Sequence, residues 1–252
     1  MLKDANVISV SESKCSHDFQ INCSSCRLSS ICLPIALDVS EVDQLDRIIQ
    51  RTRPIQKGDH LYRQDEQFNS VYAVRAGSVK AYSITDSGQE QVTGFYFPGE
   101  ILGMDGIAKH KYASSARAME TSSVCEIPFD KLGELSQRIP NLQRQLFQLM
   151  SQEITEDQQL LTLLSKNTAD QRVAALLISI SARNARRGLS STHFRLPMSR
   201  TDIGNYLGLT VETVSRVLSR LQKINVLAVD NKEITISDVD GLRAIADGSD
   251  EA

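Results

Sequence analysis

The sequence of 252 residues predicts an α+β fold with an N-terminal antiparallel β-roll, a long dimerisation helix and a C-terminal winged helix-turn-helix. Three observations favour this fold: short β-rich runs broken by Gly and Pro turns, one long helix with a regular apolar seam, and two capped helical patterns followed by a strand pair. We divide the chain into a flexible N-terminus (1–22), a cysteine loop and β-roll sensory domain (23–139), the dimerisation helix (140–165), the winged helix-turn-helix domain (166–240) and a C-terminal tail (241–252).

The composition is that of a globular protein. Hydrophobic residues make up 41% and charged residues 23% of the chain, which is ordinary. We find no run of about 18 apolar residues that could span a bilayer. The segment Met1–Lys14 has no apolar signal region, so we expect a cytoplasmic protein with no membrane partner. Because the net charge is −3, any basic surface that binds nucleic acid must be local.

The N-terminal part is marked by its cysteines. Cys23, Cys26 and Cys32 share one short loop, and thiols of a cytoplasmic chain are available to metal rather than to disulfides. Cys15 lies upstream of this loop. The helical spacing of apolar residues then predicts a helix over Val39–Arg51 with Ser40 as its N-cap.

Short strands follow over residues 54–128. Turn signals at Gly58, Gly77, 86–88 and 98–99 recur at intervals that suggest an antiparallel barrel or roll. The expected strands are Ser70–Val74, Ser78–Ile84, Gln91–Phe97 and Ser123–Ile127.

A single long helix is predicted over Pro140–Leu164. Its core-like positions alternate three and four apart, as in the seam of a two-stranded coiled coil: Phe147, Met150, Ile154, Asp157, Leu161 and Leu164. An ordinary amphipathic helix packed inside one subunit is the alternative. Asp157 argues against that alternative, because in a parallel homodimer its carboxylate would face its twin.

The last third is predicted to be helical, beginning with a helix over Gln171–Ala185. Ser199 and Asp202 form a capping box at the start of the next helix, Gly208 permits a turn, and Thr210 caps a second helix. Two short strands, Val226–Val229 and Glu233–Ile236, would form the wing.

The second of these capped helices has the pattern of a DNA reader. Its apolar side holds Val214, Val217, Leu218 and Leu221, and the opposite face carries Glu212, Ser215 and Arg216. Arg216 can donate hydrogen bonds to guanine, Glu212 can accept one from cytosine, and Ser215 can donate to or accept from a base. Phosphate contacts are expected from Arg200, Arg220 and Lys223. A solvated helix face would explain the polar residues alone, but not the caps, Gly turn and wing together.

These features together resemble the Crp/Fnr superfamily of bacterial transcription regulators, and within it the Fnr/Anr-type oxygen sensors, whose β-roll is of the cyclic-nucleotide-binding type. The resemblance rests on Gly204–Arg216, Leu33-Pro34, Pro54–Gly58, Gln91–Phe95 and Val124–Pro128, and it extends from about Cys23 to Ile236.

The resemblance implies an oxygen-labile 4Fe–4S cluster held by Cys23, Cys26, Cys32 and Cys125. Clusters of this kind take four thiolates, so a loop with three needs one from elsewhere. The implied function is a transcription activator that binds DNA as a homodimer while the cluster is intact, and that loses dimerisation and DNA binding when oxygen degrades it. A zinc-stabilised or thiol-redox regulator of the same fold is the alternative, with His17 or Cys125 as the fourth zinc ligand. A haem sensor is possible in principle, but the cysteines make it redundant.

Further roles carry over from the resemblance. It implies TTGAT-like palindromic half-sites read by Glu212, Ser215 and Arg216. It also implies contact with RNA polymerase through the loop that contains Ile84, Thr85, Asp86, Ser87 and Gly88. Arg27 follows Cys26 where the family commonly has a small or polar residue, so this cation could alter the oxygen response or be a plain exposed side chain.

Two other classes are not favoured. Met104 stands where cyclic-AMP receptors have a glutamate, and no arginine precedes Ser115-Ala116, so a cyclic nucleotide would lack partners for its ribose and phosphate. We also expect no enzyme activity, because the chain lacks a Gly-rich nucleotide loop and a paired-carboxylate motif. Its histidines, His17, His60, His110 and His193, lie in ordinary contexts.

Overall fold

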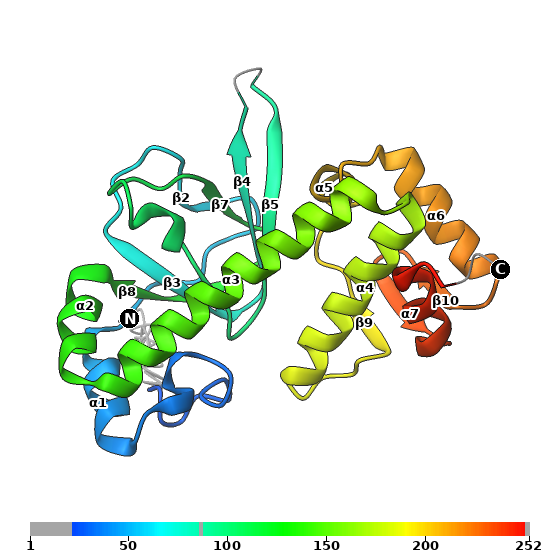
Figure 1. Cartoon of the computed structure of the whole chain (residues 1–252). Coiled ribbons are helices and arrows are strands. Elements are labelled where there is room, and N and C mark those ends of the chain that lie inside the picture. Colours follow the sequence, from blue (N-terminus) through cyan, green and yellow to red (C-terminus); the bar gives the residue numbers. More distant parts are fainter. Residues whose placement is uncertain (1–21, 86–87, 250–252) are drawn as a thin grey trace, which may run out of the picture.

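The computed structural model of the chain describes residues 22–85 and 88–249. Figure 1 shows a β-rich part and a helical part joined by one long diagonal helix. Cys15, His17, Asp86 and Ser87, together with most of the expected flexible N-terminus, lie outside the described residues. Within the described ranges, no helix is long and apolar enough to cross a membrane.

Two four-stranded antiparallel sheets form the β-roll. One sheet has the order β1 (Gln50–Arg51), β8 (Ser123–Pro128), β3 (Ser70–Ala76) and β6 (Ile101–Leu102). The other has the order β2 (His60–Tyr62), β7 (Ser115–Ala118), β4 (Val79–Ile84) and β5 (Glu90–Tyr96). The four strands expected from the sequence are confirmed as β3, β4, β5 and β8, each within about two residues at either end, an ordinary uncertainty for element ends.

Short helices close the roll. They are the 3-10 helices η1 (Leu33–Ala36) and η2 (Met104–Gly106), and the α-helices α1 (Val39–Ile48) and α2 (Phe129–Arg138). The prediction of Ser40 as N-cap was wrong: Asp38 caps α1, accepting from the Glu41 backbone N–H at 2.9 Å, while the Glu41 side chain accepts from Asp38 N–H at 2.9 Å. The helix also ends at Ile48 rather than Arg51, because residues 50–51 pair with β8. Helix α2 was not anticipated.

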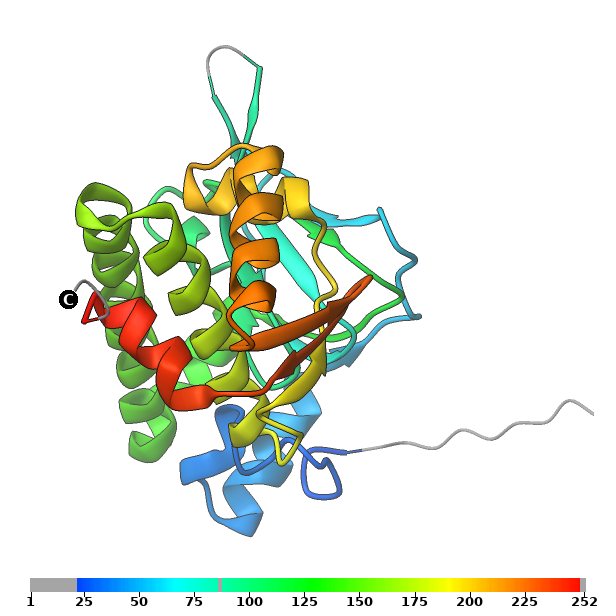
Figure 2. The same ribbon diagram turned by 90° about the vertical axis from the view of Figure 1, so that its right-hand side faces the viewer.

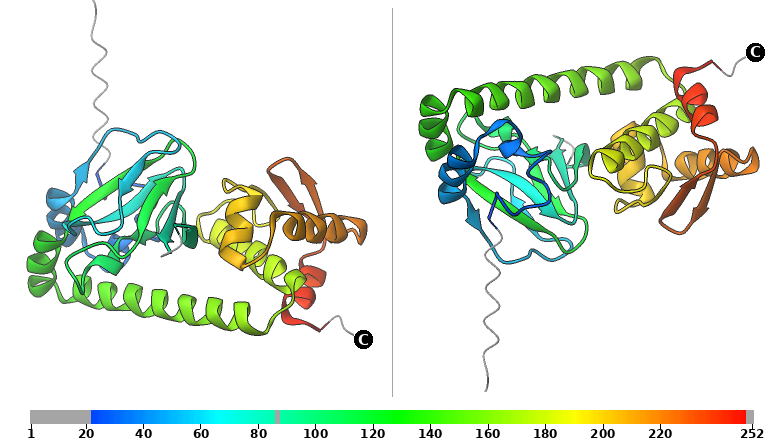
Figure 3. Two further views of the ribbon diagram at one scale, coloured as in Figure 1. Left: turned by 90° about the horizontal axis from the view of Figure 1, so that it is seen from above. Right: turned by 90° about the horizontal axis from the view of Figure 1, so that it is seen from below.

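The long helix α3 (Pro140–Lys166) follows the prediction closely. Pro140 begins it, where a missing backbone N–H costs nothing. Figure 3 shows α3 running along the outside of the molecule from the roll to the helical part. Of its side chains only Leu142 is fully buried, so most of α3 lies open to solvent or to a partner.

The C-terminal part is a winged helix-turn-helix. It contains α4 (Ala169–Arg186), β9 (His193–Arg195), α5 (Arg200–Leu207), α6 (Val211–Lys223), β10 (Leu227–Asp230), β11 (Glu233–Ile236) and α7 (Val239–Asp247). The wing is a three-stranded antiparallel sheet in the order β10-β11-β9, so β9 adds a strand that was not expected. Residues 241–247, which the sequence analysis assigned to a tail, continue α7 instead. This helix packs against α4 and buries Leu242 completely.

Candidate thiol site and DNA-reading helix

Backbone turns shape the cysteine loop. The Cys26 backbone N–H donates to Cys23 O at 3.3 Å, and that of Cys32 donates to Leu28 O at 2.9 Å. Helix η1 begins directly after Cys32, and its Leu33 is only 1% exposed in the core of the roll, beside α3. The cysteine loop is therefore followed directly by a short helix that packs against α3.

An ion pair ties this loop to the strand that carries the fourth cysteine. The Cys23 backbone N–H donates to Asp46 Oδ1 at 2.7 Å, and Asp46 pairs with Arg51. Arg51 lies opposite Cys125 in the β1–β8 ladder. These two charged residues were not singled out from the sequence, since nothing in their spacing shows that β1 pairs with β8.

The four cysteines of the described chain are free thiols that lie close enough to influence one another. Burial raises the pKa of Cys32 to about 12, and the Cys125 and Cys26 thiols add to this shift. Burial and the hydrogen bond with Asp46 raise the pKa of Cys23, with contributions from Cys125 and Cys32. The pKa of Cys125 is also raised, first by burial. Burial therefore keeps the Cys23, Cys32 and Cys125 thiols protonated at neutral pH.

This set of donors fits an iron–sulfur cluster in kind but does not form a finished metal site. Four thiols from one loop and one strand match the all-cysteine ligand set of such clusters. Among the described residues, however, no three His, Cys, Asp or Glu side chains are spaced to hold a metal ion. Arg27 is exposed beside Cys26. Binding of a cluster or metal ion therefore requires the thiols to lose their protons and to move closer together.

The predicted seam of α3 lies at the surface. Phe147 is 59%, Ile154 59% and Leu161 68% exposed. Met150 and Leu164 are half-buried, and Asp157 is exposed with its pKa raised, first by burial and then by Glu156. Apolar side chains of this size at coiled-coil spacing favour a partner helix over an ordinary surface.

Aromatic rings and carboxylates fill the roll where it faces α3. Tyr62 and Tyr112 stack with ring centroids 3.8 Å apart. The Tyr96 hydroxyl donates to Glu153 Oε1 at 3.2 Å. Burial raises the pKa of Glu153 to about 7, although the Tyr96 bond opposes this shift. The Ser114 hydroxyl donates to Asp105 Oδ2 at 2.6 Å.

Local capping builds the helix-turn-helix as the sequence predicts. Ser199 Oγ accepts from Asp202 N–H at 3.0 Å, and Asp202 Oδ2 accepts from Ser199 N–H at 2.9 Å. Gly208 ends α5 at φ 63°, in the left-handed region. Thr210 then caps α6 by accepting from Thr213 N–H at 3.2 Å.

Helix α6 buries its apolar side and presents its polar face. Glu212 and Arg216 are exposed and Ser215 is half-buried, and Figure 2 shows the length of α6 on the face turned to the viewer. The backbone amide at its own position, the Thr210 side chain and Arg216 lower the pKa of Glu212, which therefore stays ionised as an acceptor.

The residues proposed for phosphate contact differ in their exposure and in the partners that they already have. Lys223 is exposed. Arg220 is held by Asp170 on α4, with its Nε 3.1 Å from Asp170 Oδ1. Arg200 is half-buried, and its Nη1 has no hydrogen-bond partner among the described residues. Because Asp170 engages only Nε and Nη2 of Arg220, the exposed guanidinium keeps donors for a phosphate while the ion pair orients it.

The strands that flank the loop expected to contact polymerase, β4 and β5, form the hairpin that projects from the roll in Figure 1. Thr85 N–H donates to Gln89 O at 2.9 Å, and Gly88 N–H donates to Thr85 O at 2.8 Å. Ile84 is 50% exposed. Strand β5 of this hairpin contacts α5.

Comparison with known proteins finds matches along most of the chain. The cyclic nucleotide-binding domain family matches residues 52–138, and the Crp-like helix-turn-helix domain family matches residues 171–245. The chain is 52% identical over 233 residues to the transcriptional activator protein FnrA of Stutzerimonas stutzeri, covering 92% of this chain and 96% of that protein. It is 49% identical over 222 residues to the anaerobic regulatory protein of Haemophilus influenzae, covering 88% and 86%. The solved structure of FixK2 from Bradyrhizobium japonicum matches with a TM-score of 0.73 and 29% identity, covering 79% of this chain and 97% of that one.

Proposed function

The chain belongs to the Crp/Fnr family of transcription regulators as an Fnr/Anr-type member, and from this membership we propose that it activates transcription in response to oxygen. The observation that carries the proposal is the thiol set: Cys23, Cys26 and Cys32 in one loop, with Cys125 facing them from β8. The relative from H. influenzae is named an anaerobic regulatory protein, which supports a response to oxygen.

The four cysteines would hold a 4Fe–4S cluster, which when bound supplies an oxygen-labile link between four thiolates. Asp46 and Arg51 bring the loop to β8 beforehand, so little chain needs ordering when the thiolates engage. A held loop keeps η1 and Leu33 seated beside α3. When the thiolates are released from one another in air, the loop would lose the restraint of the cluster and keep only the weaker protein contacts, among them those of Asp46 and Leu33.

Dimerisation through α3 would turn this local change into a DNA response. Two copies would bury Phe147, Ile154 and Leu161, while the two Asp157 carboxylates oppose the pairing. A coupling of about 1–3 kcal/mol changes binding five- to 150-fold, which is within reach of one unfavourable charge pair. The held loop would tip the balance toward the dimer, and the released loop toward monomers.

The dimer would bind palindromic DNA in the cytoplasm. Two α6 helices set roughly 34 Å apart would enter successive major grooves. Glu212, Ser215 and Arg216 would read TTGAT-like half-sites, and Arg200, Arg220 and Lys223 would hold phosphates. The loop at 84–88 would then meet RNA polymerase bound beside it.

Cyclic nucleotide is not part of the proposal, although the matched domain family carries that name. The Tyr62–Tyr112 stack occupies the roll beside α3, and Asp105 and Glu153 add carboxylates there. A phosphodiester next to carboxylates and without an arginine would be strongly disfavoured. Nor do we propose an enzyme activity, since the matched relatives are transcription regulators.

An anaerobic purification tests the proposal. We expect a brown protein whose visible absorption bleaches in air while dimers give way to monomers. Cys125→Ser should be colourless, and Cys15→Ser, outside the thiol set, should behave as the wild type. A colourless wild-type protein that contains zinc and ignores air would instead establish the zinc-stabilised regulator.

A further inference from the structure

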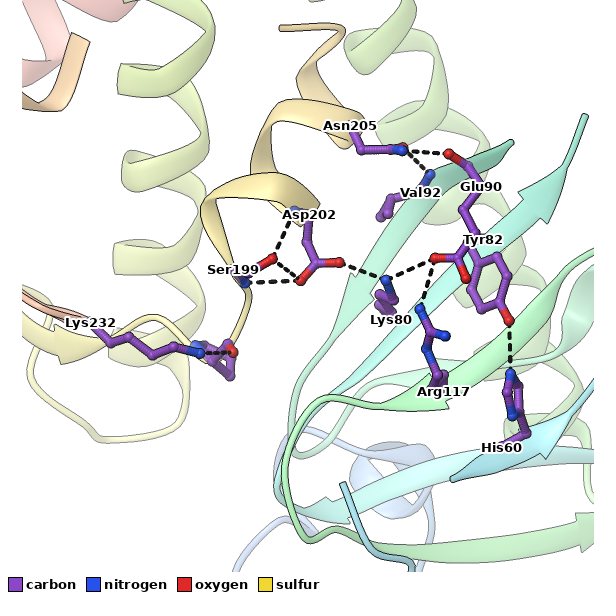
Figure 4. A network of polar contacts seen from close by, with 11 residues as sticks. His60, Lys80, Tyr82, Glu90, Val92, Arg117, Ser199, Asp202, Asn205 and Lys232 are labelled. Atoms are coloured by element: carbon purple, nitrogen blue, oxygen red, sulfur yellow. Dashed lines mark hydrogen bonds and ion pairs between the residues drawn. The ribbon is translucent and has the colours of Figure 1, made fainter. Parts of the chain in front are cut away.

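A buried lysine joins the roll to the DNA-binding part of the molecule. The side chain of Lys80 on β4 is 9% exposed, and its Nζ lies 2.6 Å from Asp202 Oδ1 on α5 and 3.3 Å from Glu90 Oε2 on β5. Arg117 on β7 holds the same Glu90 oxygen at 2.8 Å. Figure 4 shows this chain of charges running from the roll into α5. An ammonium as buried as this one depends on its carboxylates, because removing one leaves a charge unpaired.

A second set of bonds caps the open edge of the roll. Strand β5 is the last strand of its sheet, so one side of its backbone has no strand partner. Asn205 on α5 takes that place: its Oδ1 accepts from Val92 N–H at 2.6 Å and its Nδ2 donates to Glu90 O. Gln91 Nε2 donates to the backbone carbonyl of Asn205 at 2.8 Å. Helix α5 is thus bound to β5 by directional bonds, which fix its orientation as well as its distance.

The same contact is backed by apolar packing. The rings of Phe95 on β5 and Tyr206 on α5 lie 5.1 Å apart. Val92, Phe95 and Phe97 belong to the same buried cluster as the core of the helix-turn-helix. By contrast, only Asn167 and Thr168 connect α3 to α4. The orientation of α6 therefore depends on the docking of α5 as much as on the chain connection.

The docked arrangement leaves the DNA-reading face open. Glu212 and Arg216 are exposed while Lys80 is engaged. Asp202 serves two purposes at once, because it caps α5 through Ser199 and accepts from Lys80. The contact accordingly holds the helix-turn-helix without covering the polar face of α6.

We propose that Lys80 is a positioning residue for DNA binding: its ion pair with Asp202 fixes the helix-turn-helix to the roll, so that a dimer presents its two α6 helices at one spacing. This inference rests on the proposed function, in which a dimer binds palindromic DNA. It goes beyond that function by assigning the half-site spacing to a contact that touches neither DNA nor the dimer seam.

The test compares palindromes of altered spacing with a single half-site, using anaerobically purified protein. Lys80→Met keeps the length of the side chain but removes its charge. Asp202→Asn keeps an oxygen for the α5 cap but weakens the ion pair. We expect each variant to lose roughly tenfold in affinity for the wild-type spacing, to tolerate other spacings better, and to keep its half-site affinity. The double variant should lose no more than Lys80→Met alone, because Asp202→Asn weakens a contact that Lys80→Met already removes. Lys131→Met, an exposed lysine on α2, is the matched control.

Other outcomes would overturn the proposal in recognisable ways. Equal losses on half-site and palindrome would indicate a role in folding alone, and unchanged binding would show that the contact has no role. A gain in affinity would make it an inhibitory contact.

Tryptic cleavage after Lys166, beside the α3–α4 joint, provides a readout without DNA and should speed up in Lys80→Met. If the wild type binds no palindrome, the proposed function fails, and the rate of cleavage still decides whether Lys80 holds the two parts together.

Discussion

Glu153 lies half-buried between α3 and the roll, and its carboxyl faces the Tyr96 hydroxyl, Asp105, Glu156 and Asp157. Burial raises its pKa from 4.5 to about 7, so the folded state binds a proton that the unfolded state has released over this range. Stability from this group is therefore fully present below pH 4.5 and is lost as the pH rises through 7.

Glu153→Gln should abolish that loss. We expect the apo-protein variant to be more stable than the wild type at pH 8, by about 3 kcal/mol from the size of the shift, and to differ much less from it at pH 5. Urea unfolding followed across this pH range measures the effect. Gln152→Glu, at the exposed neighbouring position, should show no such dependence, and an equal pH profile for wild type and Glu153→Gln would contradict the assignment.

Asp46 is the second residue whose role can be isolated. It accepts from the Cys23 backbone and pairs with Arg51, and its charge raises the pKa of the Cys23 thiol. Asp46→Ala should free the loop and lower that pKa, and each change speeds alkylation, because the thiolate is the reactive form. We expect roughly tenfold faster labelling of Cys23 by iodoacetamide in the apo-protein, measured by mass spectrometry. Asp43→Ala, an exposed position on α1, should leave the rate unchanged; equal rates in all three proteins would mean that Asp46 does not hold the loop.

Local signals explain which elements were predictable. The caps of α5 and α6 were read correctly, because Ser199, Asp202 and Thr210 act on backbone groups within three residues. For α1 the same reasoning named Ser40, whereas Asp38 is the cap; both residue types can cap, and the sequence does not show which backbone N–H groups are free. Helix α2 was missed although Phe129, Leu132 and Leu135 recur every third residue, as on one face of a helix. Helix α7 was missed because its docking site on α4 is remote in sequence.

At the scale of elements, α3 carries the clearest testable consequence. Its exposed seam residues favour pairing with a second copy, whereas Asp157 lies between Ile154 and Leu161, where two carboxylates would meet. Asp157→Ala should strengthen the aerobic dimer roughly tenfold by removing that repulsion. Sedimentation equilibrium in air measures the dimer constant. Gln158→Ala, one residue along and outside the seam, is the control, and an unchanged constant for Asp157→Ala would place Asp157 off the interface.

At the scale of the whole molecule, the long-range contacts were beyond the reach of sequence reasoning. Lys80 and Asp202 are 122 residues apart, and nothing in the sequence around either residue indicates that the two form an ion pair. The four cysteines were identifiable as a set only through resemblance, because the pairing of β1 with β8 determines where Cys125 faces. A buried cluster spans both parts: it unites Tyr82, Val92, Phe95, Phe97 and Met119 of the roll with the core of the helix-turn-helix. A shared core of this kind predicts that the two parts unfold together.

Arg172 tests that cooperativity at the joint between the parts. Its guanidinium donates to Leu164 O at 2.8 Å and Asn167 O at 3.0 Å at the end of α3, and to Leu207 O at 3.0 Å at the end of α5. Arg172→Met leaves three helix-end carbonyls without this donor, at a cost of about 2 kcal/mol borne mainly by the C-terminal part. Scanning calorimetry should show one transition for the wild type and an earlier, separate transition for Arg172→Met. Arg186→Met, an exposed arginine on the same helix, should retain a single transition. Two transitions already present in the wild type would mean that the shared cluster does not couple the parts.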